Sequence, residues 1–271
     1  SDIYEMFSAA MIDPLPEKQR EFLIVLGLAD EFSAEMAKFI TENEDTKQLL
    51  SAMTRQNAFI SRLADGATYR FHHMMKECAE QAFAAMDKEK QTVYLERYGK
   101  WYEEHRQYLH ALASYRKSGN FNGALRVIQK DAGILLASLK AEDVLNFLSK
   151  CPKEDLEAYP LSVLVLMRCM FNWRKIPEML KLKEFLIQAI DRHKEIPEEE
   201  RGNLLGECDL ITSFLMYNDI SKMSHFHRSA SRQMSRPAIS IRNDGGWTFG
   251  SPSVLMMFHR ESGGLLKEQE E

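Results

Sequence analysis

Apolar residues recur at helical spacing along most of the 271-residue chain, and short polar segments separate the runs. Near the start, the segment 13–16 (Asp-Pro-Leu-Pro) predicts a turn, because each proline disfavours helix at the residue before it. Two helix starts are marked by residue types that commonly cap helices, namely Ser33 and either Asp45 or Thr46. The predicted helices of this region cover residues 3–12 and 17–28, a segment that opens at Ser33, and residues 45–56.

The period of the pattern then changes from 3.6 to 2. Residues 57–63 and 68–71 alternate in the manner of strands, and Asp65-Gly66 lies between them. This dipeptide favours a type I′ hairpin turn, in which both central residues have positive φ. With a further helix over residues 73–86, the order of elements predicts a winged-helix domain over residues 1–86.

From residue 87 onward the pattern is helical with short polar breaks, several of them marked by proline. Small residues such as Ala111 and Ala124 alternate with large aromatic ones, which is typical of the close antiparallel pairs in tetratricopeptide-like repeats. We therefore expect a mostly α protein, in which a tetratricopeptide-like α-solenoid follows the winged helix over residues 87–271. Further predicted helices cover residues 141–150, 161–173, 179–194 and 198–218.

Composition is that of a globular protein, with 45% hydrophobic and 28% charged residues. No apolar run approaches the ~20 residues that a bilayer requires, and no export signal opens the chain, so we expect a cytoplasmic protein. The four cysteines have no metal-ligand spacing and are expected to be reduced core thiols. The start at Ser1 and the charged end over residues 267–271 suggest a segment of a longer protein.

Charge argues against DNA binding by the winged helix. Residues 1–86 carry 8 Lys and Arg against 14 Asp and Glu, a net charge of −6. The candidate recognition helix, residues 45–56, offers only Lys47 and Arg55 as cations, whereas DNA-binding modules present a basic face to phosphates. A protein-facing packing role is favoured.

The usual motifs of catalysis and nucleotide binding are absent from the sequence: it has no phosphate-binding P-loop, no dinucleotide fingerprint and no nucleophile elbow. We therefore expect no enzyme activity and no cofactor in this chain. Adjacent His72 and His73 diverge in regular structure, and His225 and His227 lack a third ligand, so no metal site is expected.

Two segments are candidates for function. His72 and His73 lie where the second strand meets the closing helix, so one imidazole is expected to face outward while the other packs inward, and such a histidine can donate to a phosphate. After Ser221 the tail is rich in arginine and predicts a long irregular loop, with either a cationic surface for a ligand or partner, or a packed aromatic anchor with solvated arginines. Its candidate residues are Arg236, Arg242, Trp247 and Phe249.

Three stretches carry a resemblance to a known family. They are Leu49-Leu50-x-x-Met53-x-x-x-Asn57-x-Phe59 with Tyr69-Arg70-Phe71-His72-His73-Met74-Met75, then Trp101-Tyr102-Glu103-Glu104 to Gly119-Asn120-Phe121, and finally Ser235-Arg236-Pro237 to Gly246-Trp247-Thr248-Phe249-Gly250-Ser251-Pro252. The chain resembles the winged-helix arm and helical sensor of MalT-like, LuxR-family transcription regulators, which are signal-transducing NTPases of the STAND class. Met74-Met75 departs from the Leu-Phe usual in the family.

The resemblance implies a regulatory role in a larger protein. An NTPase domain would precede this segment and bind ATP or ADP, and His72 or His73 would contact the nucleotide phosphate in the resting state. A small-molecule or protein inducer would act on the solenoid, release the arm and permit self-association, while DNA would be bound only through a C-terminal helix-turn-helix missing here. The alternative is a freestanding helical-repeat adaptor that binds a protein or peptide.

Overall fold

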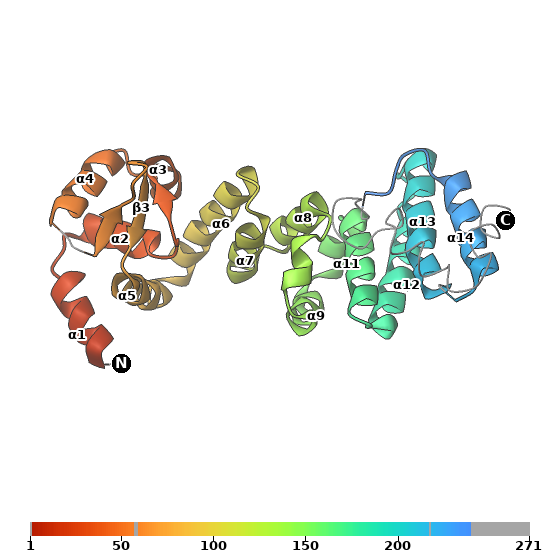
Figure 1. Ribbon diagram of the computed structural model, residues 1–271, viewed down its shortest axis with the longest axis horizontal. Helices are drawn as coiled ribbons and strands as arrows, with labels where there is room; N and C mark the ends of the chain where they lie inside the picture. The colour runs from red at the N-terminus through yellow and green to blue at the C-terminus, as the bar shows by residue number, and fades with distance from the viewer. Residues whose placement is uncertain (1, 57–58, 217, 240–271) are drawn as a thin grey trace. The chain divides into compact units, whose positions relative to one another are not determined.

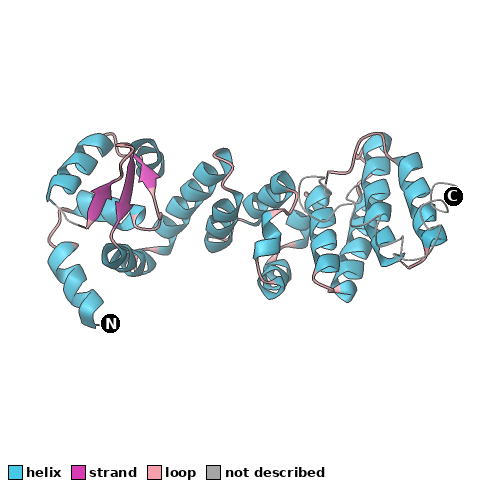
Figure 2. Ribbon diagram, viewed as in Figure 1, coloured by secondary structure: helices cyan, strands magenta, loops and turns pink. Residues whose placement is uncertain are grey.

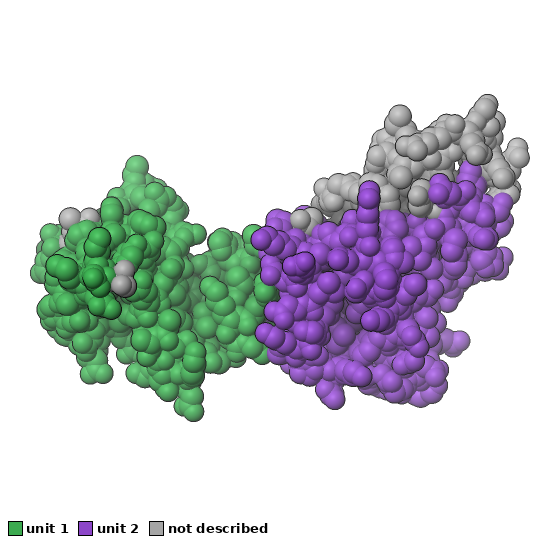
Figure 3. All heavy atoms as spheres, turned by 90° about the horizontal axis from the view of Figure 1, so that it is seen from below, with its two compact units in different colours: residues 1–120 green, residues 121–271 purple. Residues whose placement is uncertain are grey.

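The computed structural model describes residues 2–56, 59–216 and 218–239 (Figure 1). The chain divides into two compact units, Ser1–Asn120 and Phe121–Glu271, which Figure 3 distinguishes by colour. Across the described ranges, α-helices predominate and the three strands all lie in the first unit (Figure 2). No helix in those ranges is long and apolar enough to cross a membrane.

The first unit begins with a winged helix, as the sequence predicts. A helix pair, α6 and α7, follows it. The elements in order are α1 (Asp2–Met11), α2 (Glu17–Leu26), β1 (Phe32–Ser33), α3 (Ala34–Thr41), α4 (Thr46–Gln56), β2 (Ile60–Arg62), β3 (Thr68–Phe71), α5 (His73–Ala84), α6 (Lys88–Glu104) and α7 (Tyr108–Ser118).

The wing is a three-stranded antiparallel sheet with the order β1-β3-β2. The predicted hairpin is confirmed, but the prediction of a type I′ turn is wrong. That turn requires positive φ at both central residues, and Gly66 has it whereas Asp65 does not. The Asp65 carboxylate instead accepts hydrogen bonds from the backbone N–H groups of Ala67 and Thr68, both at 2.9 Å, and organises a longer loop. β1 is too short to leave a periodic signal, and the sequence did not predict it.

The first unit has a continuous apolar core that extends beyond the winged helix. Leu23, Val25 and Leu26 of α2 are fully buried, and α2 packs against α5. From α6, the buried Tyr98 hydroxyl donates a 2.7 Å hydrogen bond to the Val25 carbonyl, and α6 also packs on α3. The compact unit therefore extends to Asn120. The expected boundary at residue 86 between the winged helix and the helical repeats stays a prediction.

α6 and α7 pack closely against each other in the first unit. Gly99 lies against the ring of Tyr115, and a Cβ at position 99 would come within 2.6 Å of that ring. The Tyr115 hydroxyl donates a 2.8 Å hydrogen bond to the buried Glu103 carboxylate. Small-against-large packing of this kind is what the alanine and aromatic pattern predicts for tetratricopeptide-like pairs.

The second unit is helical throughout its described part. Its main contacts are made by the neighbouring pairs α11 with α12 and α13 with α14, together with α8 against α11. The elements are α8 (Phe121–Asp131), η1 (Leu135–Ser138), α9 (Ala141–Lys150), α10 (Lys153–Glu157), α11 (Pro160–Asn172), α12 (Ile176–Arg192), α13 (Glu198–Ser213), η2 (Phe214–Met216) and α14 (Ile220–Gln233).

These helices confirm the mostly α class and the helical array predicted after the winged helix. Two of them, α10 and α14, lie where no helix was expected. α14 falls in the tail, so the prediction of an irregular segment from Ser221 is wrong as far as Gln233. The capping carboxylate of Asp219 accepts from the Lys222 N–H at 3.0 Å and starts this helix.

Candidate functional site

The two adjacent histidines lie at the junction of β3 and α5. β3 ends at Phe71, and His72 is the N-cap of α5, with an extended backbone (φ −60°, ψ 148°). Its backbone N–H donates to the Phe59 carbonyl, and its ring lies edge-on to the Phe59 ring with the centroids 5.8 Å apart. The strand and the helix start thus fix where the imidazole lies.

The cap hydrogen bond also fixes which ring nitrogen of His72 is free to donate. Nδ1 accepts from the backbone N–H of Met74 at 3.3 Å, so the neutral ring carries its proton on Nε2. The side chain is exposed, and the first turn of α5 contains no acidic residue. An anion at this point would meet the Nε2–H group and the positive end of the helix dipole together.

His73 lies in a different environment. Its Nε2 atom is 2.8 Å from the Glu77 carboxylate one helical turn later, and its side chain is 74% exposed. The expectation that one histidine packs inward is wrong, because β3 ends before His72 and both rings reach solvent. Of the two, only His72 has no carboxylate partner among the described residues.

The arginine-rich tail is described only in part. Arg236 lies beside α13, where its guanidinium donates to the Glu200 carboxylate at 2.6 Å and lies 3.8 Å from that of Glu207. Its charge is thus matched by carboxylates of its own unit. The other predicted tail residues, Arg242, Trp247 and Phe249, lie outside the described residues, so the ligand or partner surface stays a prediction.

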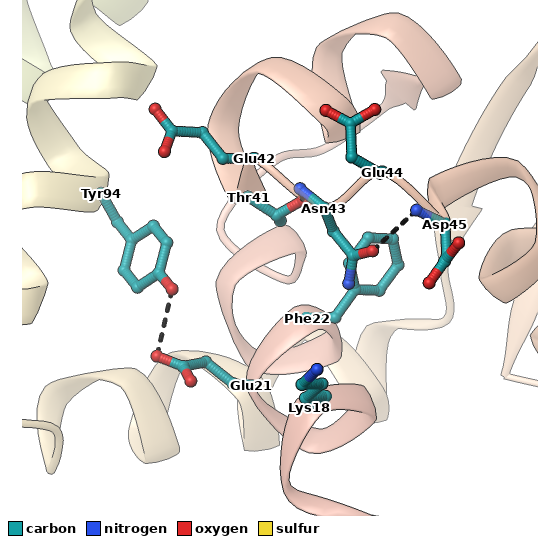
Figure 4. Close-up of a pocket in the computed structure, with 9 residues that line it drawn as sticks. All are labelled: Lys18, Glu21, Phe22, Thr41, Glu42, Asn43, Glu44, Asp45 and Tyr94. Carbon is teal, nitrogen blue, oxygen red and sulfur yellow. Dashed lines mark hydrogen bonds between the residues drawn. The ribbon is translucent and has the colours of Figure 1, made fainter.

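An acidic hollow that the sequence did not predict lies among α2, α6 and the α3–α4 loop (Figure 4). It measures about 410 Å³, and a hydrogen bond from the Tyr94 hydroxyl to Glu21 at 3.0 Å spans one side. Three of its carboxylates lie together in the α3–α4 loop, and only the fold adds the distant Glu21 of α2. They have basic neighbours: Lys90 for Glu21, Arg97 for Glu42 and Lys38 for Glu44.

The described residues hold no cluster of three or more histidine, cysteine or acidic side chains that could bind a metal ion. All four cysteines are free, and three of them are buried. Burial raises the pKa of the Cys169 and Cys208 thiols to about 11, so both stay protonated at neutral pH. The three buried cysteines are core residues, as the sequence predicts, but Cys151 is only partly buried, so the expectation of a core thiol is wrong there.

Comparison with known families supports the resemblance for the first part of the chain. None of the curated proteins compared with the chain matches it. Residues 8–91, however, match the family model described as the MalT winged helix domain. This range runs from α1 to the first turn of α6 and includes both histidines. The match supports a MalT-like family and agrees with the winged helix that the structure shows in this range.

Proposed function

We propose that this chain is the signal-sensing and regulatory portion of a LuxR-family, MalT-like transcription regulator of the STAND class. In this proposal the winged helix is an arm that contacts an NTPase domain elsewhere in the same polypeptide. The helical pairs that follow receive an inducer, and inducer binding changes the arm's contact with that domain. The match of residues 8–91 to the MalT winged helix domain is the observation that carries the proposal.

We assign the arm's contact with the nucleotide to His72. Its exposed Nε2–H group lies at the N-terminus of α5, where a phosphate is favoured by both a donor and the helix dipole. His73 is less suited, because the Glu77 carboxylate already accepts from its ring and would repel a phosphate. The proposed partner is therefore the phosphate of ADP or ATP bound by the NTPase domain.

A protein-facing role also agrees with the surface of α4, the helix that a DNA-binding winged helix would insert into the major groove. Lys47 and Arg55 are its only basic residues, and the Arg55 Nε atom donates to the Ser51 carbonyl of the same helix at 3.2 Å. In this proposal DNA is bound by a C-terminal helix-turn-helix of the larger regulator and not by this winged helix.

The test is the rate at which ADP leaves the complete gene product. The substitution His72→Ala removes one charge-assisted hydrogen bond and is expected to speed ADP release at least about ten-fold. His73→Ala is expected to change the rate less than two-fold, and His225→Ala, an exposed histidine of α14, serves as the matched control.

An unchanged ADP release rate in the His72 variant would refute the phosphate contact. Equal acceleration by the two neighbouring substitutions would point to general loosening of the helix start instead. A complete gene product that binds no nucleotide would refute the regulator itself.

A further inference from the structure

A second hollow lies within the first unit, where the winged helix meets α6 and α7. It measures about 500 Å³, which is in the range of small-molecule sites. One side is an apolar wall of two aromatic and two leucine side chains, and three of its four residues are buried. The apolar wall consists of Leu28, Phe83, Leu95 and Tyr98.

The other side presents side chains of α6 and α7 that can donate hydrogen bonds. His110, Ser114 and Lys117 lie on one face of α7, at helical spacings of four and three residues. Tyr102 of α6 lies beside them, with its ring centroid 5.1 Å from that of His110. We name Tyr102, Ser114 and Lys117 the donor group.

Two hydroxyls of the donor group belong to largely buried residues and have no protein partner in the part of the chain that the structure describes. Tyr102 and Ser114 are each only 9% exposed, and among the described residues neither hydroxyl forms a hydrogen bond. Both residues line the hollow, and neither hydroxyl is among the fully enclosed polar atoms, so each remains accessible. The neighbouring Tyr98, by contrast, donates a hydrogen bond from its hydroxyl to the Val25 carbonyl. The hydrogen-bonding capacity of both hydroxyls therefore remains available to a ligand or to water.

The charges around the hollow favour an anion on the α7 side. Burial, reinforced by Asp30, raises the pKa of Tyr102 to about 12, so its hydroxyl remains a donor at neutral pH. Two acidic groups lie on the α5 side: Glu80 lines the hollow, and Asp30 lies near enough to raise the pKa of Tyr102. Lys76 offsets both, because it pairs with Asp30 and lies 4.0 Å from Glu80. Lys117 on α7 has no acidic partner among the described residues.

We propose that this hollow binds a small aromatic carboxylate. The ring of the ligand lies against the apolar wall, and its carboxylate accepts hydrogen bonds from the two hydroxyls of the donor group, close to the ammonium of Lys117. Because α5 and α7 both contribute to the lining, the bound ligand joins the winged helix to the helix pair. The site depends on the first unit alone, so its failure would leave the regulator proposal unaffected.

Titration calorimetry of the full chain with 2-naphthoate tests the site. Saturable binding is expected, with at least about ten-fold weaker binding of the neutral isostere 2-naphthamide. Acetate, which lacks the ring, is expected to show no binding at the same concentrations. Equal affinity for the acid and the amide, or no saturable binding of 2-naphthoate at millimolar concentration, would overturn the proposal.

Variants locate the binding. The substitution Ala113→Phe places a ring in the hollow from an exposed position of α7, so it is expected to abolish binding while the circular dichroism spectrum stays the same. Tyr102→Phe is expected to weaken 2-naphthoate binding about ten-fold, because it deletes one hydroxyl donor to a charged acceptor. Tyr108→Phe, at the start of α7 and outside the lining, is the matched control and is expected to bind as the parent does. Unchanged affinity in the Ala113 variant would show that the ligand binds elsewhere.

Discussion

A close approach between the end of α2 and α5 tests how the winged helix is packed. Gly27 follows α2 directly, with φ −64°, a conformation that alanine adopts without strain. A Cβ at position 27 would overlap the Ala79 Cβ, because the two atoms would lie over about 1 Å closer than the 3.4 Å at which ordinary van der Waals contact begins. Because the Ala79 methyl group is fixed to its backbone, no rotamer change relieves the overlap, and the helices must separate.

Separation of α2 from α5 affects a well-packed core, since Leu23, Val25 and Leu26 are fully buried. Overpacking of this kind costs about 2 kcal/mol. For a unit of this size that corresponds to a decrease in Tm of roughly 8 °C. We therefore expect the substitution Gly27→Ala to lower the calorimetric transition of the first unit by this amount in the full chain.

A compensating substitution isolates the overlap. Ala79→Gly alone is expected to cost about 1 kcal/mol, because glycine is unfavourable inside a helix. In the double variant with Gly27→Ala the clash is gone, so the total cost is expected to stay near 1 kcal/mol, against about 3 kcal/mol if the two effects add. A double variant as unstable as that sum, or a Gly27→Ala protein as stable as the parent, would refute the packing argument.

Three further predictions concern single interactions. Tyr98→Phe removes the side-chain donor to the Val25 carbonyl, which keeps only the Leu28 N–H at 3.3 Å, and is expected to lower the unfolding free energy by about 1 kcal/mol in urea titrations. Gly119→Ala, at a left-handed C-cap (φ 74°) with open space around it, is expected to cost about 1 kcal/mol through backbone strain alone, as calorimetry can show. Hydrogen bonds to the carboxylate of Glu157 and then to that of Glu195 raise the pKa of His193 above its usual 6.5. The protonated imidazole therefore stabilises the folded protein fully below pH 6.5, and this stabilisation fades as the pH rises through the raised pKa. His193→Gln is expected to lower Tm below pH 6.5 and to change it little at higher pH, as Tm measured against pH can show.

Sequence patterns predicted the helices well where an apolar stripe or a cap marks them. Ser33 was predicted to open a helix, and its hydroxyl accepts from the Met36 N–H at 3.1 Å. The patterns failed for β1, which has two residues and is defined by pairing with β3 from far along the chain. They also failed for α14, because its residues are mostly polar and its position depends on packing against α13.

The candidate sites also differ in whether a local sequence pattern marks them. A local motif identified the adjacent histidines, but it could not separate them, because the distinction rests on the Nδ1 contact of His72 and on the Glu77 partner of His73. The two hollows left no signal, since their lining residues come from segments up to about 90 positions apart. Only the fold brings Leu28 of the winged helix close to Lys117 of α7.

The positions of the proposed contacts suggest how one winged helix could serve two kinds of partner. α5 carries His72 at its N-terminus, whereas Glu80, Phe83 and Ala84 near its other end line the hollow beside α6 and α7. A single 12-residue helix thus links the proposed phosphate contact to the proposed ligand site. A ligand that ties the end of α5 to α7 would favour one orientation of this helix, and that same orientation sets where the His72 imidazole points. Coupling between the two sites requires that ligand binding change ADP release in the complete gene product, and that Ala113→Phe remove this effect without changing release in the absence of ligand.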